Sequence, residues 1–469
     1  MRSAESRGRG RQAVGWVTAL LLLAAGACRR QPPTSRPNLV LVVLDTVRRD
    51  ATHGTGASPE LDRLERRGTL FTNAWANGPW TVPSHASLFT GLLPVEHGCD
   101  SLDPRLRTPR STLAELLGRS GYETAAFFSN PWLSDQLSGL LRGFQLRSEG
   151  PTVDPAGMRH GDQGGANTLE RVQEWLARRR DARPFFLFVN LLEAHLPYDP
   201  PVDWRQREGL DPETIVDESW AHEFNAGLHP AASQDWARLR RLYTGDVYAA
   251  DRLLGALLRL VETEGPNGNT VIAVTSDHGE NLGDHGLVEH QFGIHETLLA
   301  VPLVVLAPGR LAPGVRNDPV MLSDLFATLL ELAAVAADSP RRFSRSLLGP
   351  SAPSDRPVFA EYAGAPPSLL EMLQRMNPHL DAARLAPGYS TVRVGQVRLT
   401  LSDSGTAQLH DLAADPAQQR DIAAERSGVV GVLEELLRQA QAGRVERHAE
   451  PLPIDEELRE RLRSLGYVR

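Results

Sequence analysis

The sequence contains no lysine, and its 50 basic residues are all arginines. Any role that requires a cationic side chain therefore passes to arginine or histidine. The 58 acidic residues give a formal net charge of -8, and the pI is near 6.0. Because proteins that bind nucleic acid carry a basic stripe or patch, this balance predicts no nucleic-acid-binding surface.

Cysteine is also scarce, with Cys28 and Cys99 as the two thiols. The apolar segment Val14–Ala25 follows several arginines and is too short to span a bilayer, a pattern typical of an export signal over residues 1–27. It ends in Leu23-Ala24-Ala25-Gly26-Ala27-Cys28, which resembles the bacterial lipobox with Cys28 as the lipidated residue. The sequence therefore predicts an exported cell-envelope lipoprotein, in the periplasm or on the outer face of a membrane, with ordinary secretion as the alternative. If Cys28 is acylated, one thiol remains and no intrachain disulfide can form.

A tether over residues 28–37 precedes a series of continuous apolar runs, a pattern typical of strands buried on both faces of a parallel sheet. The runs are Leu39–Leu44, Ala125–Phe128, Phe185–Val189, Val271–Val274 and Leu303–Leu306. Helices are predicted between them, at Pro59–Arg67, at Thr112–Arg119 with a capping box from Thr112 to Glu115, and at Leu169–Arg180. Strands that alternate with helices predict an α/β domain over residues 38–350, a three-layer sandwich around a mostly parallel mixed sheet.

From about residue 355 the pattern changes to short strands around turns, which predicts a small C-terminal α+β subdomain with an antiparallel sheet over residues 355–469. Its strands are expected at Arg356–Tyr362, Tyr389–Val394, Val397–Leu401 and Gln408–Asp411. Two stretches, Pro200–Gln234 and Gly364–Pro387, have no clear place in this scheme. We interpret them as insertions that form either lids over a site or plain surface loops.

Polar residues follow three of the predicted strands at the point where each strand ends. Asp45 follows the first run, His195 lies soon after Phe185–Val189, and Asp277 and His278 follow Val271–Val274. Because ligands of parallel α/β sheets bind beyond the carboxyl ends of the strands, these side chains are expected to converge on one site.

Four segments carry a resemblance to a known family. They are Leu44–Asp50, Thr81–Gly91, Glu193–Tyr198 and Thr275–Gly286. In this order they resemble the first metal segment, the nucleophile motif Cys-x-Pro-Ser-Arg, the His-x-Pro-Tyr element and the second metal segment of the sulfatase family, in the alkaline phosphatase superfamily. The resemblance covers roughly residues 37–469 and implies an alkaline-phosphatase-like fold. The chain departs from the motif at Thr81, where a sulfatase has a cysteine that is oxidised to formylglycine, and at His85, where the family has arginine.

The resemblance implies one divalent metal ion (Mn, Zn, Mg or Ca) held by Asp45, Asp277, His278 and the hydroxyl of Thr81. Two carboxylates neutralise the charge of the cation, and an imidazole adds a nitrogen ligand of intermediate softness. A hydroxyl on a metal has a lowered pKa, so Thr81 is expected to act as the nucleophile and to form a covalent ester. The short helix that starts near Ser84 favours an anion at its N-terminus.

The family positions suggest further roles. His195 is expected to bind the substrate anion or protonate the leaving group, and His85 to donate to the nucleophile oxygen. His290 falls near an active-site lysine of the family, which this chain lacks. Two-metal relatives carry an Asp-x-x-x-His pair where this chain has Glu193-x-His195, which favours a single metal. The residues expected to contact substrate are Arg48, Asn77 and Trp80.

The ester itself does not follow from the family. A threonine cannot be converted to formylglycine, and threonine nucleophiles resemble those of nucleotide phosphodiesterases and of bacterial phosphoglycerol or phosphoethanolamine transferases. The first hypothesis is therefore a hydrolase of phosphodiester or phosphonate esters, with transfer to another hydroxyl left open. The second is a sulfatase with an unmodified Thr81, and the third is a catalytically silent lipoprotein that binds anions.

The lipidation of Cys28 is testable on the mature protein. Mass spectrometry of the protein from its membrane fraction should find a chain that begins at a diacylated Cys28, and Cys28→Ala should abolish the modification. A mature chain without lipid on Cys28 contradicts the prediction.

Overall fold

The computed structural model describes residues 36–150, 161–180, 183–229, 233–264 and 269–445, together with residues 455, 456, 458, 459 and 462. From Arg36 onward the chain forms one compact unit. The predicted export signal over residues 1–27 and the predicted lipidation site Cys28 lie outside the described residues. None of the described helices combines the length and the apolar character that crossing a membrane requires.

The centre of the fold is an eight-stranded sheet. Its strands are β1 (Asn38–Leu44), β2 (Thr69–Phe71), β4 (Glu123–Phe128), β5 (Leu146–Glu149), β6 (Phe185–Leu191), β7 (Thr270–Thr275), β9 (Leu303–Leu306) and β10 (Gly314–Arg316). They lie in the order β10-β2-β9-β7-β1-β6-β4-β5. All five predicted apolar runs form strands of this sheet, which is mostly parallel.

Strand β9 differs from its neighbours in direction. It pairs antiparallel with both β7 and β2, whereas the other pairs of the sheet are parallel. A parallel partner requires a long crossover connection, usually a helix. The helices in the segment between β7 and β9 are only short turns, of which α10 (Glu296–Leu299) is one, and β9 returns beside β7 in the opposite direction.

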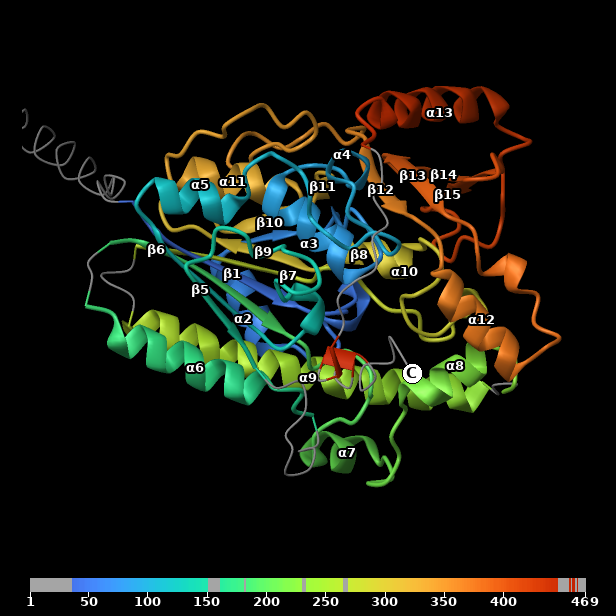
Figure 1. Ribbon diagram of the computed structural model, residues 1–469, viewed down its shortest axis with the longest axis horizontal. Helices are drawn as coiled ribbons and strands as arrows, with labels where there is room; N and C mark the ends of the chain where they lie inside the picture. Colours follow the sequence, from blue (N-terminus) through green and yellow to red (C-terminus); the bar gives the residue numbers. More distant parts are fainter. Residues whose placement is uncertain are drawn as a thin grey trace, which may run out of the picture. The chain divides into compact units, whose positions relative to one another are not determined.

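Helices cover both faces of this sheet (Figure 1). One face carries α2 (Pro59–Arg67), α6 (Gly165–Arg178) and α9 (Ser233–Glu264), and the other carries α3 (Thr81–Thr90), α5 (Leu113–Arg119) and α11 (Asp324–Leu332). Alternate residues of β1 belong to the two resulting cores. Leu39, Leu41 and Val43 pack in the core with α3, α5 and α11, and the residues between them pack in the core with α2, α6 and α9. The predicted three-layer sandwich is confirmed.

The three helices predicted from local sequence signals are present. Helix α2 has the predicted bounds, and α5 has the predicted capping box, in which Thr112 Oγ1 accepts from the Glu115 N–H at 3.2 Å and Glu115 Oε2 accepts from the Thr112 N–H at 2.8 Å. Helix α6 begins at Gly165, earlier than predicted, and ends at Arg178. The long helix α9 was not predicted.

The C-terminal part contains the predicted antiparallel sheet, in the order β12-β13-β14-β15. Its strands are β12 (Val358–Tyr362), β13 (Tyr389–Val394), β14 (Val397–Ser402) and β15 (Ala407–Asp411), and α13 (Ser427–Gln441) packs on it. A three-stranded sheet contains β3 (Ala74–Trp75), β8 (Ala300–Val301) and β11 (Val320–Met321). The other short helices are η1 (Arg49–Ala51), α4 (Pro94–His97), η2 (Pro131–Leu133), η4 (Asp284–Gly286) and η5 (Ala382–Arg384).

The two unplaced stretches contain helices and meet each other. The first holds α7 (Val202–Glu208) and α8 (Glu218–Asn225), and the second holds α12 (Pro367–Met376). Leu373 of α12 packs with Ala226 and with Phe292 in a third core cluster. The interpretation as plain surface loops is therefore wrong.

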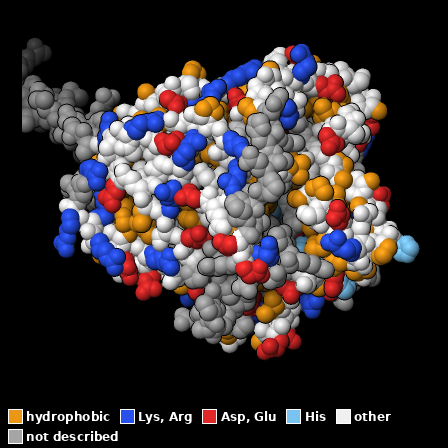
Figure 2. Space-filling view, viewed as in Figure 1, with side chains coloured by type: hydrophobic (Ala, Val, Ile, Leu, Met, Phe, Trp, Pro, Cys, Tyr) orange, Lys and Arg blue, Asp and Glu red, His pale blue; other side chains and the backbone are white. Residues whose placement is uncertain are grey.

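On the face in Figure 2, arginine and acidic side chains are interspersed.

Candidate active site

The sheet brings two carboxylates together at one edge. Strands β1 and β7 are parallel neighbours with Val43 opposite Thr275, so Asp45 and Asp277 leave the sheet side by side. The ligand atoms of Asp45, Asp277 and His278 all lie within 4.8 Å of one another, and each of the three residues is completely buried. The predicted convergence of strand ends is found here.

Each carboxylate has one oxygen that accepts hydrogen bonds from the protein and one that accepts none. Asp45 Oδ2 accepts from the side-chain amides of Asn130 at 2.8 Å and Asn190 at 3.0 Å. Asp277 Oδ1 accepts from the backbone N–H of Thr46 at 3.2 Å and of His278 at 3.0 Å. The remaining oxygens, Asp45 Oδ1 and Asp277 Oδ2, are buried and have no hydrogen-bond partner. Since a buried polar atom without a hydrogen-bond partner is costly, this donor set fits a divalent cation.

The protonation states reflect this crowding of charge. Burial raises the pKa of Asp277 to about 7. Burial, and then repulsion from Asp277, raises the pKa of Asp45. Burial lowers the pKa of His278 to about 3, so the imidazole is neutral. A bound cation would favour the ionised carboxylates and needs a neutral imidazole, so the set is matched to a metal.

His278 presents one ring nitrogen to the site. Its Nδ1 lies 2.9 Å from the Gly279 carbonyl oxygen, a contact that fixes the proton on Nδ1 and leaves Nε2 as a ligand. Thr81 Oγ1 lies 3.4 Å from that Nε2. The threonine hydroxyl therefore lies beside the imidazole of the candidate metal-binding group.

Thr81 is the first residue of α3, and Trp80 precedes it in extended conformation. No side chain caps this helix start, and Thr81 is fully buried. The unpaired N–H groups and the dipole of a helix start favour an anion. An anionic ester held there would lie against the Thr81 hydroxyl.

Thr46, directly after Asp45, has a strained backbone. Its φ of 57° lies in the left-handed region that β-branched residues rarely adopt. The Tyr243 hydroxyl on α9 donates to the Thr46 carbonyl at 2.8 Å, and the Thr46 N–H donates to Asp277. Strain of this kind costs about 1–3 kcal/mol and persists where surrounding contacts hold it. Here the contacts of Thr46 with Tyr243 and Asp277 hold the residue after Asp45 against Asp277.

His290 lies beside His278 of the candidate metal-binding group, and His195 lies beside His290. The His290 ring centroid lies 4.4 Å from that of His278 and 5.2 Å from that of His195. His195 Nδ1 lies 2.8 Å from the Leu196 carbonyl oxygen, and His290 Nδ1 lies 3.3 Å from Glu280 Oε1. The structure thus brings together the histidines that the family positions suggested.

Glu193 is directed away from this group. Its Oε1 accepts from the N–H of Gly165, at the start of α6, at 2.8 Å. A Cβ on Gly165 would overlap the Glu193 carboxylate, so only glycine permits this approach. Gln163 donates to the carbonyl oxygen of His195. These contacts anchor the segment that carries His195 to α6.

His85 lies one turn after Thr81 on α3 and is fully buried. Its Nδ1 lies 2.8 Å from the backbone carbonyl of Thr81 and 3.5 Å from Asp277 Oδ2. The described contact is thus with the main-chain oxygen of Thr81. In this geometry His85 holds the first turn of α3 against Asp277.

The three residues expected to contact substrate are engaged elsewhere. Arg48 pairs with Asp50 at 2.7 Å and with Asp284 at 2.6 Å. Asn77 donates to the Phe359 carbonyl and accepts from the Ser323 N–H. Trp80 packs edge-to-face on Trp132, with ring centroids 4.8 Å apart. These contacts favour structural roles around the site for all three.

Asn130, Asn190 and Glu280 are site residues that the sequence reasoning missed. Asn130 follows the carboxyl end of β4 and Asn190 lies near that of β6, so both share the strand-end position of Asp45. A polar residue at the end of each apolar run was the available signal. Glu280 is part of the second metal segment, but its contact with His290 depends on the fold.

The comparisons with known proteins agree with this geometry. A family model described as Sulfatase matches residues 37–335. The chain belongs to the sulfatase family. Arylsulfatase K of Mus musculus is 25% identical over 480 residues, which cover 90% of this chain and 83% of that protein. The ulvan-active sulfatase of Formosa agariphila is 24% identical over 430 residues, which cover 84% and 78%.

Solved structures share the fold of this sulfatase-family chain. The phosphonate monoester hydrolase of Agrobacterium radiobacter superposes with a TM-score of 0.67 at 22% identity, over 87% of this chain and 96% of that one. BT4656, in complex with its substrate D-glucosamine-2-N,6-O-disulfate, has a TM-score of 0.67 at 18% identity, over 87% and 98%. The chain is therefore a sulfatase-family hydrolase, consistent with cleavage of sulfate or phosphate esters.

Metal affinity should depend on pH in a direction set by the carboxyl groups. Because the pKa of Asp277 is near 7, protons compete with a cation below that pH. The Kd for Mn²⁺, measured by titration calorimetry, should fall about tenfold per pH unit up to about pH 7 and then level off. Asp277→Asn should remove most of the affinity, whereas Asp355→Asn, at an exposed site, should not. A Kd that is constant over this range contradicts the assignment.

Proposed function

We propose that the protein is a metal-dependent hydrolase that uses Thr81 as its nucleophile, acting on phosphodiester or phosphonate esters. The observation that carries this proposal is the position of the Thr81 hydroxyl, 3.4 Å from His278 Nε2, at the start of α3. Asp45, Asp277, His278 and Thr81 would hold one divalent cation. When bound, the cation would lower the pKa of the hydroxyl and neutralise charge on the substrate.

The chain's own residues supply the remaining steps. The start of α3 binds the anionic oxygens of the ester, which places the phosphorus atom in front of Thr81. Thr81 Oγ1 gives its proton to an adjacent neutral imidazole as it forms a bond to phosphorus, and the bond to the leaving oxygen breaks. The leaving oxygen then takes that proton from the imidazole, for which His195 and His290 are the adjacent candidates. Water then hydrolyses the threonine ester and restores Thr81. Transfer to another hydroxyl instead of water is the open variant.

Two features support a phosphorus ester. Thr81 cannot form the formylglycine on which sulfatases depend, and an unmodified alkoxide is the nucleophile of phosphodiesterases that this motif resembles. A phosphonate monoester hydrolase is among the structures that share the fold.

Sulfate ester hydrolysis is the second candidate. It is favoured by the relatives in sequence, which include arylsulfatase K and an ulvan-active sulfatase, and by the structural neighbour bound to a sulfated glucosamine. Nothing among the described residues favours the third hypothesis, a silent anion-binding lipoprotein. The export and lipid anchoring of the chain through Cys28 remain a proposal from the sequence.

The assay uses purified, metal-loaded protein with p-nitrophenyl esters of phosphate, both mono- and diester, of phenylphosphonate and of sulfate. Phosphodiester or phosphonate turnover should dominate. Thr81→Ala should lower kcat/KM by at least about 10³, as the loss of a nucleophile does, while Thr81→Ser should keep part of the activity. Thr244→Ala, on α9, serves as the control and should have no effect.

Two results contradict this proposal. Dominant sulfatase activity would select the second candidate. Stoichiometric metal binding with no turnover of any ester would select the silent anion-binding protein.

A further inference from the structure

A cavity of about 410 Å³ lies at the same edge of the large sheet as the metal-ligand group, but farther along that edge. Its wall includes Thr72 and Asn73, which follow the carboxyl end of β2, and Asn317, which follows that of β10. Strand β2 has the same direction as β1 and is the third strand from it, about 14 Å away at about 4.8 Å per strand. None of the described residues that line the cavity belongs to the metal-ligand group.

Two arginines from distant parts of the chain line this cavity. Arg49 lies in η1, and Arg393 lies on β13 of the C-terminal sheet. Arg49 Nη1 donates to the Thr72 carbonyl at 3.0 Å and Arg393 Nη2 donates to Asn73 Oδ1, so both side chains reach the turn between β2 and β3. Burial lowers the pKa of Arg393, the Glu296 carboxylate raises it, and the charge of Arg49 lowers it again. The two cations are therefore close enough to repel each other.

Arg393 is a fixed part of the wall. It is buried, and its guanidinium lies 5.0 Å from the centre of the Trp75 ring. Its Nη1 lies 3.2 Å from Glu296 Oε1, and its Nε donates to the Gly395 carbonyl at 3.0 Å. Protein groups thus hold this cation in place, and its position does not depend on a ligand.

Arg49, by contrast, keeps unused donors. The residue is half-buried, and among the described residues its guanidinium makes one hydrogen bond, that to Thr72, and no ion pair. Its Nε and Nη2 therefore remain available to a ligand. A guanidinium held partly out of water and beside a second cation is stabilised by an anion, and its paired donors match the oxygens of sulfate or phosphate.

The rest of the wall leaves the charge of Arg49 unopposed. Glu296 is the carboxylate among the described residues that line the cavity, and its Oε1 accepts from Trp75 Nε1 at 3.0 Å and lies against Arg393. Its charge therefore offsets that of Arg393. The other lining residues carry no charge and are Thr72, Asn73, Asn317, Gln396, Leu412 and Pro416. A cavity with this excess of positive charge favours an anion.

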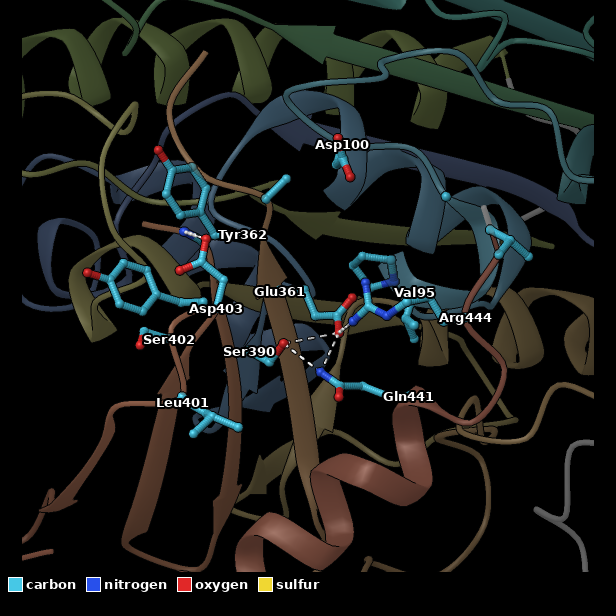
Figure 3. A pocket seen from close by; sticks show the side chains of 17 residues that line it. Val95, Asp100, Glu361, Tyr362, Ser390, Leu401, Ser402, Asp403, Gln441 and Arg444 are labelled. Atoms are coloured by element: carbon cyan, nitrogen blue, oxygen red, sulfur yellow. Dashed lines mark hydrogen bonds and ion pairs between the residues drawn. The ribbon is translucent and has the colours of Figure 1, made fainter. Parts of the chain in front are cut away.

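The cavity beside β12 and α13 has the opposite balance of charge (Figure 3). Its volume is similar, about 420 Å³, but Asp100, Glu361 and Asp403 line it, and Arg444 is the arginine among the described lining residues. That arginine is paired with Glu361 at 3.3 Å. Of these two cavities, the one at Arg49 is therefore the one suited to an anion.

We propose that the cavity between Arg49 and Arg393 is a binding site for a sulfate or phosphate group, separate from the start of α3. Arg49 donates from Nε and Nη2 to two oxygens of the group, and the side-chain amides of Asn317 and Gln396 donate to the others. The group comes either from a free anion or from a substituent on a sugar, since both present the same oxygens. The proposal does not depend on which ester the enzyme cleaves.

Arginine-specific labelling with phenylglyoxal, read by peptide mass spectrometry, locates the site in the full-length Thr81→Ala protein, in which turnover plays no part. Saturating sodium sulfate or phosphate should slow the labelling of Arg49 at least about fivefold relative to sodium chloride of equal ionic strength, as an occupied site does. Arg375, exposed on α12 outside the cavity, should be labelled equally under all conditions.

Glucose 6-sulfate is the second probe and distinguishes the two sources of the group. Protection of Arg49 by the inorganic anions supports a site for a free anion, and protection by glucose 6-sulfate alone supports a site that takes the group on a sugar. Equal labelling of Arg49 in sulfate, phosphate, glucose 6-sulfate and chloride overturns the proposal.

Variants give a second measurement, with sulfate titrated into the Thr81→Ala protein by calorimetry. Arg49→Gln removes the charge and should raise the Kd about tenfold, whereas Arg49→Lys keeps the charge and should raise it only about threefold. Any binding at the start of α3 is the same in these proteins, so their difference reports the cavity. Arg375→Gln is the control and should change nothing. An unchanged Kd in Arg49→Gln contradicts the assignment, and the test requires no variant of the buried Arg393.

Discussion

The repulsion between two buried carboxylates is the constraint around which this site is built. Asp45 and Asp277 are placed side by side by neighbouring parallel strands, in a region from which water is excluded. Burial of the pair raises both pKa values, which is an unfavourable arrangement that a bound cation would relieve. Asp45 Oδ1 and Asp277 Oδ2 make no hydrogen bond and are therefore the oxygens available to a cation.

The surrounding strands and helices hold the two carboxylates in this position. Asn130 and Asn190 fix one oxygen of Asp45 from β4 and β6, and the strained Thr46 is held by Tyr243 from α9. On the other side, α8 and α12 enclose the loop that carries His290. The Asn225 side chain accepts from the Val288 N–H at 3.0 Å, and Asn377 bonds the end of α8. The two insertions thus hold the segment that carries His290 in place.

The features that the sequence predicted correctly depend on neighbouring residues or on the position of a residue at the end of an apolar run. The capping box from Thr112 to Glu115 and the bounds of α2 depend on neighbouring residues, and both are confirmed. The position of Asp45, Asp277 and His278 after apolar runs predicted that they converge, and the resemblance to the sulfatase family implied that they are the metal ligands. The direction of β9, by contrast, depends on the kind of connection that precedes it, which an apolar run does not reveal. The partners Asn130 and Asn190 depend on strand order, and the packing of α8 against α12 depends on contacts far apart in sequence.

The central claim is that the Thr81 hydroxyl, placed beside the metal ligands, attacks the ester. Acid quenching of the metal-loaded enzyme during turnover of a phosphodiester, followed by peptide mass spectrometry, tests this step most directly. The account predicts a phosphoryl adduct on the peptide that carries Thr81, and no adduct in Thr81→Ala. Steady turnover with no adduct on Thr81, or an adduct on another residue such as His85, would contradict it.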